Sequence, residues 1–154
     1  MTTSYVTQAT QWPSAAAIPD DVQKLIALFY ETADSKDPGA GLVLAEKVFS
    51  KNASLLSAGG AFNGFDEIAK SRDNAWGAVT SRKHEILRVY VHDATGHELV
   101  LLGHMQMVCL NGMNLDLPFS ARVVVDDDSK AQGRRLKLMQ VFADSAPVAE
   151  ALEK

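Results

Sequence analysis

The fold class of this protein is decided by residues 82–126, which read RKHEILRVYVHDATGHELVLLGHMQMVCLNGMNLDLPFSARVVVD. Apolar and β-branched residues dominate three long runs, and the turn sequences Asp93-Ala94-Thr95-Gly96 and Asn111-Gly112 separate them. An Asn-Gly pair between two such runs is typical of a β-hairpin. The stretch therefore predicts antiparallel strands over residues 82–92, 97–111 and 114–126, and residues 134–143 predict one more.

The chain before this stretch has the spacing of helices. Pro19, Asp20 and Asp21 suit a helix start, and apolar residues then recur at helical spacing up to about Lys36. Pro38 and Gly39 end this helix. Further on we expect a helix over 41–49, a short strand over 53–57, a tight strand or turn over 61–63, and a third helix from 66 to 79.

These elements predict an α+β domain. We expect one curved mixed or antiparallel sheet that forms a cone-shaped barrel and packs against three N-terminal helices. The domain should span residues 19–144. Residues 1–18 show no clear period and predict a flexible N-terminal arm, and residues 145–154 predict a C-terminal tail.

Composition narrows the class of partner. The chain has 154 residues, 47% of them hydrophobic, and a formal net charge of −4, which argues against nucleic acid. No apolar run approaches the ~20 residues that span a bilayer, and the first 18 residues lack the features of a secretory signal. We therefore expect a cytoplasmic protein. The single cysteine, Cys109, excludes an internal disulfide, and the histidine spacing predicts no metal. Gly59-Gly60 lacks the strand and helix context of a dinucleotide site, and we expect no cofactor.

Polar side chains interrupt the predicted strands, and they are the candidates for a pocket. A polar group in an apolar strand must find a partner, reach solvent or face a ligand. By strand alternation, His84, Arg88 and Tyr90 should share one face, either the cavity side or the solvent side. His104 is as well explained by a core or interface contact as by a ligand. The candidate ligand contacts are Arg88, His104, Gln106, Tyr30 and Trp76.

Four short motifs, in this order, resemble a known superfamily. They are YETADSKD at 30–37, FSKNASL at 49–55, SRKH at 81–84 and LMQVFAD at 138–144. The order of helices, Gly-rich turn and long strands is similar to that of the nuclear transport factor 2-like superfamily, which includes SnoaL-like polyketide cyclases, scytalone dehydratase and ketosteroid isomerase. The resemblance covers residues 19–144 and implies a cone-shaped α+β barrel that encloses a pocket.

The resemblance also implies candidate catalytic residues. Asp34 resembles the helix-one aspartate of the dehydratase, and His84 resembles one of its pocket histidines. The second pocket histidine of the dehydratase has no match. Ser57 and Ala58 stand where ketosteroid isomerase has its aspartate, so proton abstraction by that route is not expected. From the residues alone, Asp34 either caps a helix or orients His84, and His84 is either exposed or an acid/base.

Two functions follow as hypotheses. The first is a lyase, isomerase or cyclase that uses acid–base chemistry on a hydrophobic, oxygenated, polyketide- or terpenoid-like molecule. The alternative is a non-catalytic ligand-binding or dimerisation module of the same fold. In either case strands with apolar residues on both faces predict a homodimer through the outer face of the sheet.

Overall fold

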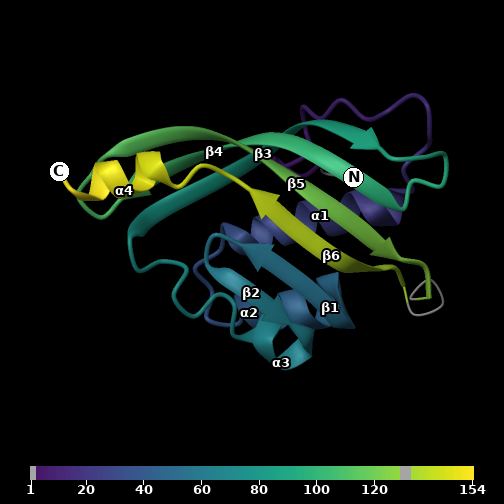
Figure 1. The fold of residues 1–154 in the computed structure, drawn as a ribbon, viewed down its shortest axis with the longest axis horizontal. Helices are drawn as coiled ribbons and strands as arrows, with labels where there is room; N and C mark the ends of the chain where they lie inside the picture. The colour runs from purple at the N-terminus through teal and green to yellow at the C-terminus, as the bar shows by residue number, and fades with distance from the viewer. Residues whose placement is uncertain (1–2, 129–132) are drawn as a thin grey trace.

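A curved mixed sheet forms the centre of the molecule in the computed structural model, which describes residues 3–128 and 133–154 (Figure 1). The elements in chain order are α1 (Asp20–Ala33), α2 (Ala40–Val43), the π-helical turn η1 (Leu44–Val48), β1 (Phe49–Ser57), β2 (Gly60–Asn63), α3 (Gly64–Ala69), β3 (Val79–Val91), β4 (Glu98–Cys109), β5 (Asn114–Asp126), β6 (Arg135–Phe142) and α4 (Ala146–Leu152). The strand order is β2-β1-β6-β5-β4-β3. Strands β1 and β6 are parallel, and the other neighbours are antiparallel.

Helices α1, α2 and α3 lie together on one side of the sheet, and α4 lies at the far end beside the tips of β4 and β5 (Figure 1). This arrangement confirms the predicted α+β fold with a cone-shaped curved sheet and N-terminal helices. The sheet does not close into a complete barrel. No helix within residues 3–128 or 133–154 is long and apolar enough to cross a membrane.

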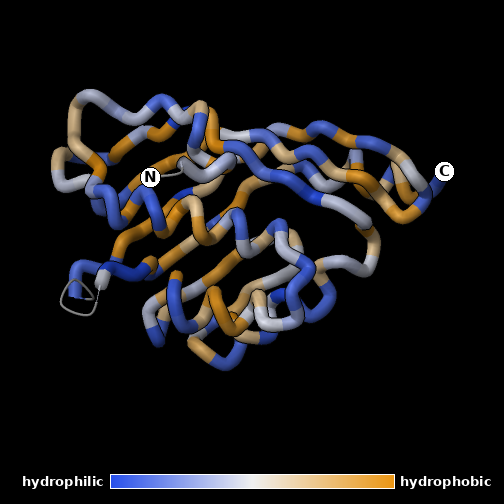
Figure 2. The backbone as a smooth tube through the Cα atoms, turned by 180° about the vertical axis from the view of Figure 1, so that it is seen from behind, coloured by the Kyte–Doolittle hydropathy of each residue, from blue (hydrophilic) through white to orange (hydrophobic). Residues whose placement is uncertain are grey.

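The core lies between the helices and the concave face of the sheet. Along β4, Leu99 and Leu101 are fully buried, whereas Val100 and Leu102 between them are exposed. All four residues are hydrophobic, so the alternation here is one of burial, whereas other stretches in Figure 2 change between hydrophobic and hydrophilic residues along a strand. The buried face of α1 contributes Ile26 to the same core. The buried alternate residues of the strands therefore pack against the apolar face of α1, as the sequence predicts.

The third helix is shorter than predicted. Helix α3 ends at Ala69, and turns follow over residues 70–77 in which several N–H groups bond the carbonyl three residues back, as from Ala75 to Arg72. The prediction of a helix through Val79 is therefore wrong. Apolar residues at helical spacing, such as Trp76, are instead used in side-chain contacts with the end of α1.

The N-terminal segment is fixed more firmly than a loose arm would be. Val6 is buried, its carbonyl oxygen accepts a hydrogen bond from the N–H of Ile86, and the N–H of Gln11 donates to Leu87. These bonds satisfy part of the exposed edge of β3, which would otherwise be open to pairing with another strand. Sequence periodicity misses this segment because only scattered positions in it are buried.

A β-bulge in β3 changes which residues face the helices. Ile86 pairs with Gly103 and Arg88 pairs with Leu102, so Leu87 is an extra residue in the strand. Beyond this point Val89 is buried, and Arg88 and Tyr90 are exposed. The expectation that His84, Arg88 and Tyr90 share a face is therefore wrong, because the bulge reverses the alternation between them.

Candidate functional site

Asp34 and His84 form the centre of the candidate site. Asp34 follows the last residue of α1, and His84 stands on the concave face of β3. The Nδ1 atom of His84 lies 2.5 Å from Oδ1 of Asp34, and the backbone N–H of His84 donates to Oδ2 at 2.8 Å. Both side chains are largely buried, with exposed fractions of 12% for His84 and 6% for Asp34. The carboxylate therefore holds both the ring and the backbone of His84 in place.

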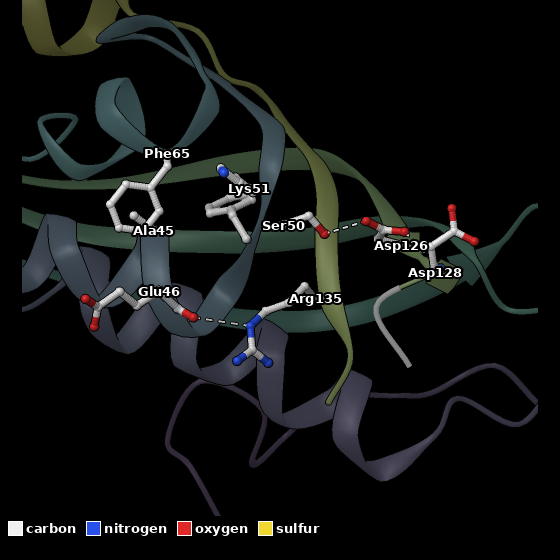
Figure 3. A pocket seen from close by; sticks show the side chains of 9 residues that line it. Ala45, Glu46, Ser50, Lys51, Phe65, Asp126, Asp128 and Arg135 are labelled. Carbon is white, nitrogen blue, oxygen red and sulfur yellow. Dashed lines mark hydrogen bonds between the residues drawn. The ribbon is translucent and has the colours of Figure 1, made fainter. Parts of the chain in front are cut away.

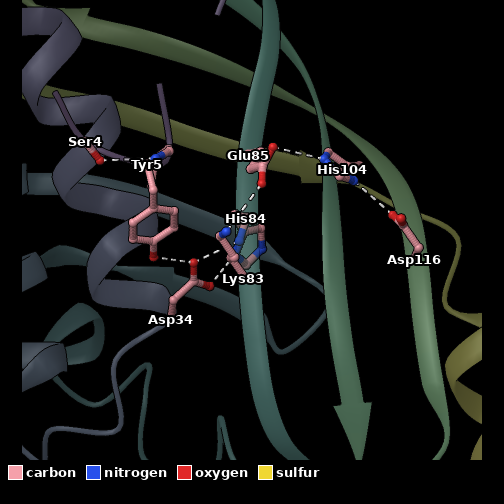
Figure 4. Close-up of polar contacts among 9 residues, drawn as sticks. Ser4, Tyr5, Asp34, Lys83, His84, Glu85, His104 and Asp116 are labelled. Carbon is pink, nitrogen blue, oxygen red and sulfur yellow. Dashed lines mark hydrogen bonds and ion pairs between the residues drawn. The ribbon is translucent and has the colours of Figure 1, made fainter. Parts of the chain in front are cut away.

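The N-terminal segment completes the surroundings of Asp34. The hydroxyl of Tyr5 donates to Oδ2 of Asp34 at 2.7 Å, as Figure 4 shows. Burial, and then this hydrogen bond, raises the pKa of the Tyr5 phenol, so the group stays a proton donor at neutral pH. A buried carboxylate is stable only when its oxygens are hydrogen-bonded. Both oxygens of Asp34 are already used, one by His84 alone and the other by His84 and Tyr5.

The other nitrogen of the His84 ring is the chemically available atom. When Asp34 accepts the Nδ1–H, the neutral ring must carry its lone pair on Nε2. Among the described residues, Nε2 has no hydrogen-bond partner, and it is not among the fully buried atoms. The arrangement can therefore take a proton at Nε2 and return it, while Asp34 stabilises the charged ring.

Aromatic rings fix the His84 ring from two sides. The ring centroid of Tyr30 lies 4.9 Å away and that of Phe119 lies 5.4 Å away. Tyr30 is fully buried, and its hydroxyl is 4.0 Å from the sulfur of Met139. Burial raises the pKa of Tyr30, so this phenol is also neutral. These contacts leave the imidazole little freedom to turn away from Asp34.

An apolar wall continues across the sheet from His84. Met105 pairs with His84 in the register of β3 and β4, and Leu117 pairs with Met105 in that of β4 and β5. Both are only partly buried, in contrast to Leu99 and Leu101 on the same face. The concave face is thus less tightly covered beside His84 than in the core. Asp34 and His84 therefore stand beside a partly exposed apolar surface.

Two arginines and Trp76 surround the end of α1. Arg72 donates from Nη2 to the carbonyl of Ala33 at 2.7 Å, and the indole N–H of Trp76 donates to the carbonyl of Ser35 at 3.1 Å. Arg82 stands two residues before His84 and lies 4.8 Å above the Trp76 ring. Each of residues 33–35 therefore has a side-chain partner. Arg72 binds residue 33, His84 and Tyr5 bind residue 34, and Trp76 binds residue 35.

The sequence-predicted site residues separate into two groups. Asp34, His84 and Tyr30 come together, and Trp76 binds the residue next to Asp34. Arg88, His104 and Gln106 lie on the outer face of the sheet instead. Arg88 bonds Gln11. His104 lies 2.9 Å from Asp116 and 3.3 Å from Glu85, and Figure 4 shows His104 between these two carboxylates. Odd-numbered residues of β4 face the helices, so His104 and Gln106 point away from His84.

Sequence reasoning missed Tyr5, Arg72, Arg82 and Phe119. The position of Arg82 two residues before His84 on the same strand was a usable signal, because alternate residues share a face. The sequence offers no such signal for Tyr5, because the apolar residues around it follow neither strand nor helix spacing. Phe119 is found only through the register that places it opposite Gly103.

Two clefts among the described residues lie away from the Asp34 and His84 side chains. One, of about 670 Å³, lies between η1, β1 and β6, and Figure 3 shows its polar contacts, from Ser50 to Asp126 at 2.6 Å and from Arg135 to the carbonyl of Glu46 at 3.3 Å. The other, of about 480 Å³, is lined by residues of β3, β4 and β5 that include Arg82, Gln106 and Asp116. Neither is lined by Asp34 or His84.

No protein-family model and no curated protein matches this sequence. Solved structures match it in fold. TerC, co-crystallized with polyporic acid, is 15% identical with a TM-score of 0.68, over 88% of this chain and all (100%) of that one. A protein with a ketosteroid isomerase-like fold from Catenulispora acidiphila, in complex with trimethylamine, is 11% identical with a TM-score of 0.64, over 86% of this chain and 91% of that one.

A third structure carries the superfamily name. It is an NTF2-like protein of unknown function from Burkholderia pseudomallei, 17% identical with a TM-score of 0.64, over 88% of this chain and 97% of that one. Identities this low describe the fold and not the reaction. Together with the curved mixed sheet and its N-terminal helices, they establish that this chain has the nuclear transport factor 2-like fold.

Proposed function

We propose that this protein is a cofactor-independent lyase, isomerase or cyclase that acts on a hydrophobic, oxygenated small molecule. The observation that carries the proposal is the contact between Asp34 and His84, with Nε2 of His84 left without a partner among the described residues. In this mechanism His84 moves the proton through Nε2, and Asp34 holds the ring in the tautomer that keeps Nε2 basic.

The substrate class rests on what surrounds the pair. Met105 and Leu117 offer an apolar wall, and the partly buried Trp76 adds aromatic surface beside the residue that follows Asp34. A polyketide- or terpenoid-like carbonyl compound fits this mixture, because its carbon skeleton is apolar and the carbon next to its carbonyl group carries an acidic C–H. That TerC was crystallized with polyporic acid also supports small-molecule binding within this fold.

The test is exchange of substrate hydrogen for deuterium, because it detects proton removal whichever product forms. The protein is incubated in D2O with a panel of aromatic and terpenoid ketones, and exchange at the carbon next to the carbonyl is followed by NMR. We expect His84→Ala to slow exchange by about 10²–10⁴-fold, the usual effect of a positioned acid/base. His104→Ala is the matched control, since His104 lies on the other face of the sheet.

A double-mutant cycle tests whether the pair acts as a unit. Asp34→Asn should remove much of the same activity, because an amide can present a donor where His84 needs an acceptor. The two losses should be strongly non-additive. Exchange that survives in His84→Ala would rule out the mechanism. Ligand binding without any exchange in the wild type would favour the alternative, a non-catalytic binding module.

We also propose a homodimer formed through the outer face of the sheet. Four large side chains on this face are exposed by 40–52%: Tyr90, Val100, Leu102 and Phe142. The register places Tyr90 opposite Val100, and Ser120 lies between Leu102 and Phe142, so the four span adjoining strands. An apolar surface shared across neighbouring strands is what a second copy would cover. The cytoplasmic location stays a prediction from the sequence.

A further inference from the structure

Two buried guanidinium groups beside the Asp34–His84 pair lack full sets of partners. Nε of Arg72 and Nη1 of Arg82 are buried and have no hydrogen-bond partner within the described part of the chain. Each arginine makes a hydrogen bond from Nη2 to a backbone carbonyl, Arg72 to Ala33 and Arg82 to Ala75 at 3.0 Å. A buried charged donor without a partner destabilises the folded protein, so such atoms are rare in native structures.

The charge of Asp34 stabilises both guanidinium groups at a distance, but no carboxylate of the described residues bonds either of them directly. Neither arginine forms an ion pair among the described residues, and the nearby carboxylate of Asp34 already accepts its bonds from His84 and Tyr5. Arg72, Arg82 and the Asp34 carboxylate together carry a charge of one positive unit when His84 is neutral, because two guanidinium groups stand beside one carboxylate. Lys36 adds another cation, 5.1 Å from the Trp76 ring.

The two arginines also act on each other. Burial, and next the charge on Arg82, lowers the pKa of Arg72 to about 10, and burial lowers the pKa of Arg82. The hydrogen bond to the end of α1 uses Nη2 of Arg72, but Nε of the same side chain stays buried without a partner among the described residues. An anion placed between the groups would supply the missing acceptors and offset the repulsion, because guanidinium groups bind delocalised oxyanions with paired hydrogen bonds.

We propose that Arg72 and Arg82 bind a delocalised oxyanion of the ligand, so that the substrate is an apolar molecule carrying a carboxylate or an ionised enol. This inference rests on the proposed function, because it names the substrate class of the same site. Arg82 shares the strand face of His84, and Arg72 binds the residue before Asp34. The oxyanion would thus position the apolar part of the ligand against His84 and the wall formed by Met105 and Leu117.

Benzoate and benzamide are the probes, since they have nearly the same shape and differ in charge. Each is titrated into the wild-type protein and followed by two-dimensional NMR. We expect benzoate to bind at least ~10-fold more tightly than benzamide, which corresponds to about 1.4 kcal/mol. Shifts should centre on residues around Arg72, Arg82 and Trp76. Equal affinity for the two probes, or no binding of benzoate at up to tens of millimolar, would overturn the proposal and leave water as the partner of these nitrogens.

Substitutions then assign the effect. Arg72→Gln and Arg82→Gln should each weaken benzoate binding by roughly 10-fold or more, the usual effect of losing a charge-assisted hydrogen bond, and leave benzamide unchanged. Arg122→Gln is the matched control, because Arg122 is on the outer face and pairs with Glu98 at 2.7 Å. Benzoate affinity that survives both changes would also overturn the proposal. If a glutamine variant fails to fold, the comparison of the two probes on the wild type still decides.

Failure here is distinguishable from failure of the proposed reaction. His84→Ala keeps both arginines, so it should retain the preference for benzoate while losing deuterium exchange. If the protein prefers benzoate but catalyses no exchange, the oxyanion-site proposal stands and the proposed enzymatic reaction is refuted. If the protein catalyses exchange through His84 but does not prefer benzoate, the proposed reaction stands and the oxyanion-site proposal is refuted.

Discussion

The ring of Phe119 stands edge-on to the ring of His84, with the centroids 5.4 Å apart and the planes at 83°. This contact depends on Gly103 of β4, the strand that lies between His84 on β3 and Phe119 on β5. A Cβ atom built on Gly103 would lie 2.7 Å from Cζ of Phe119 and 2.5 Å from the carbonyl oxygen of Glu85, closer than real Cβ contacts allow. Gly103 is therefore part of what holds the candidate site in shape.

Gly103→Ala should destabilise the protein and displace Phe119. Overpacking of this kind costs about 1–3 kcal/mol, or a fall in melting temperature of roughly 2–4 °C per kcal/mol for a chain of this size. Thermal unfolding followed by circular dichroism measures it. Gly59→Ala is the control, because the nearest atom to a Cβ there, the hydroxyl oxygen of Ser57, is at an ordinary 3.6 Å. Equal melting temperatures for the two variants would contradict this reading.

Tyr5→Phe should weaken the link between the N-terminal segment and the site. The change removes one hydrogen bond to a buried carboxylate and keeps the ring, so we expect a loss of about 1–2 kcal/mol in the free energy of unfolding. Urea denaturation measures this loss. Tyr90→Phe, at an exposed tyrosine, should have almost no effect. A Tyr5→Phe variant as stable as the wild type would show that the contact with Asp34 contributes nothing net.

The tautomer of His84 is a prediction that needs no substrate. Because Oδ1 of Asp34 accepts from Nδ1, neutral His84 should carry its proton on Nδ1 and present a bare Nε2. Nitrogen-15 NMR of the imidazole distinguishes the two tautomers. In Asp34→Ala the preference should relax toward the Nε2–H form that free histidine favours. A wild-type ring already protonated on Nε2 in its neutral form would remove the basis for the proton-transfer role.

His104 should make the stability of the protein depend on pH. The hydrogen bond to Asp116, opposed by burial and aided by Glu85, raises its pKa above the ordinary value of 6.5. Its protonated form is therefore bound more favourably in the folded state. The stabilisation is complete below about pH 6 and is lost as the pH rises through the raised pKa.

The size of this effect should be small because the contacts lie at the surface. We expect less than about 1 kcal/mol between acid and alkaline conditions. Chemical denaturation of the wild type and of His104→Gln across pH 5.5–8.5, a range of roughly three units around the ordinary histidine pKa, isolates the contribution. The difference between the two proteins should shrink as the pH rises. A difference that grows with pH would have the wrong sign.

Charge placed in the outer apolar surface should prevent dimerisation. Leu102 is 40% exposed near the middle of this surface, and Leu102→Lys would bury an ammonium group at the proposed interface. Light scattering at micromolar concentration should report a dimer for the wild type and a monomer for the variant. Leu42→Lys, at a residue of α2 that is 46% exposed, should leave the dimer intact. A monomeric wild type would refute the homodimer outright.

Sequence alone predicted much of this structure for physical reasons. Period-two burial along β4 and the Asn111-Gly112 turn fix a hairpin locally, and Gly112 has the positive φ of 82° that such a turn requires. The position of Asp34 after α1 and of His84 on β3 came from resemblance, and the structure brings the two side chains together.

The misses share a cause. The bulge at Leu87 reverses which alternate residues of β3 face the helices, and nothing in the composition marks it. The face on which Arg88 and Tyr90 lie could therefore not be predicted from strand alternation. The packing of residues 5–11 depends on an unpaired edge of β3 that exists only after the sheet has formed. Both depend on contacts between distant parts of the chain, and local periodicity carries no information about those.

The parallel pairing of β1 with β6 has a consequence for how the protein is made. Residues 49–57 bind residues that lie about eighty positions further on, as Leu55 does with Met139. During synthesis the first half of the chain would leave the ribosome with one edge of β1 unpaired until the last strand appears. Pairings of such long range make folding slow, and exposed strand edges invite aggregation. Destabilising changes in β6 should therefore reduce the soluble yield more than equally destabilising changes in the hairpin of β3 and β4.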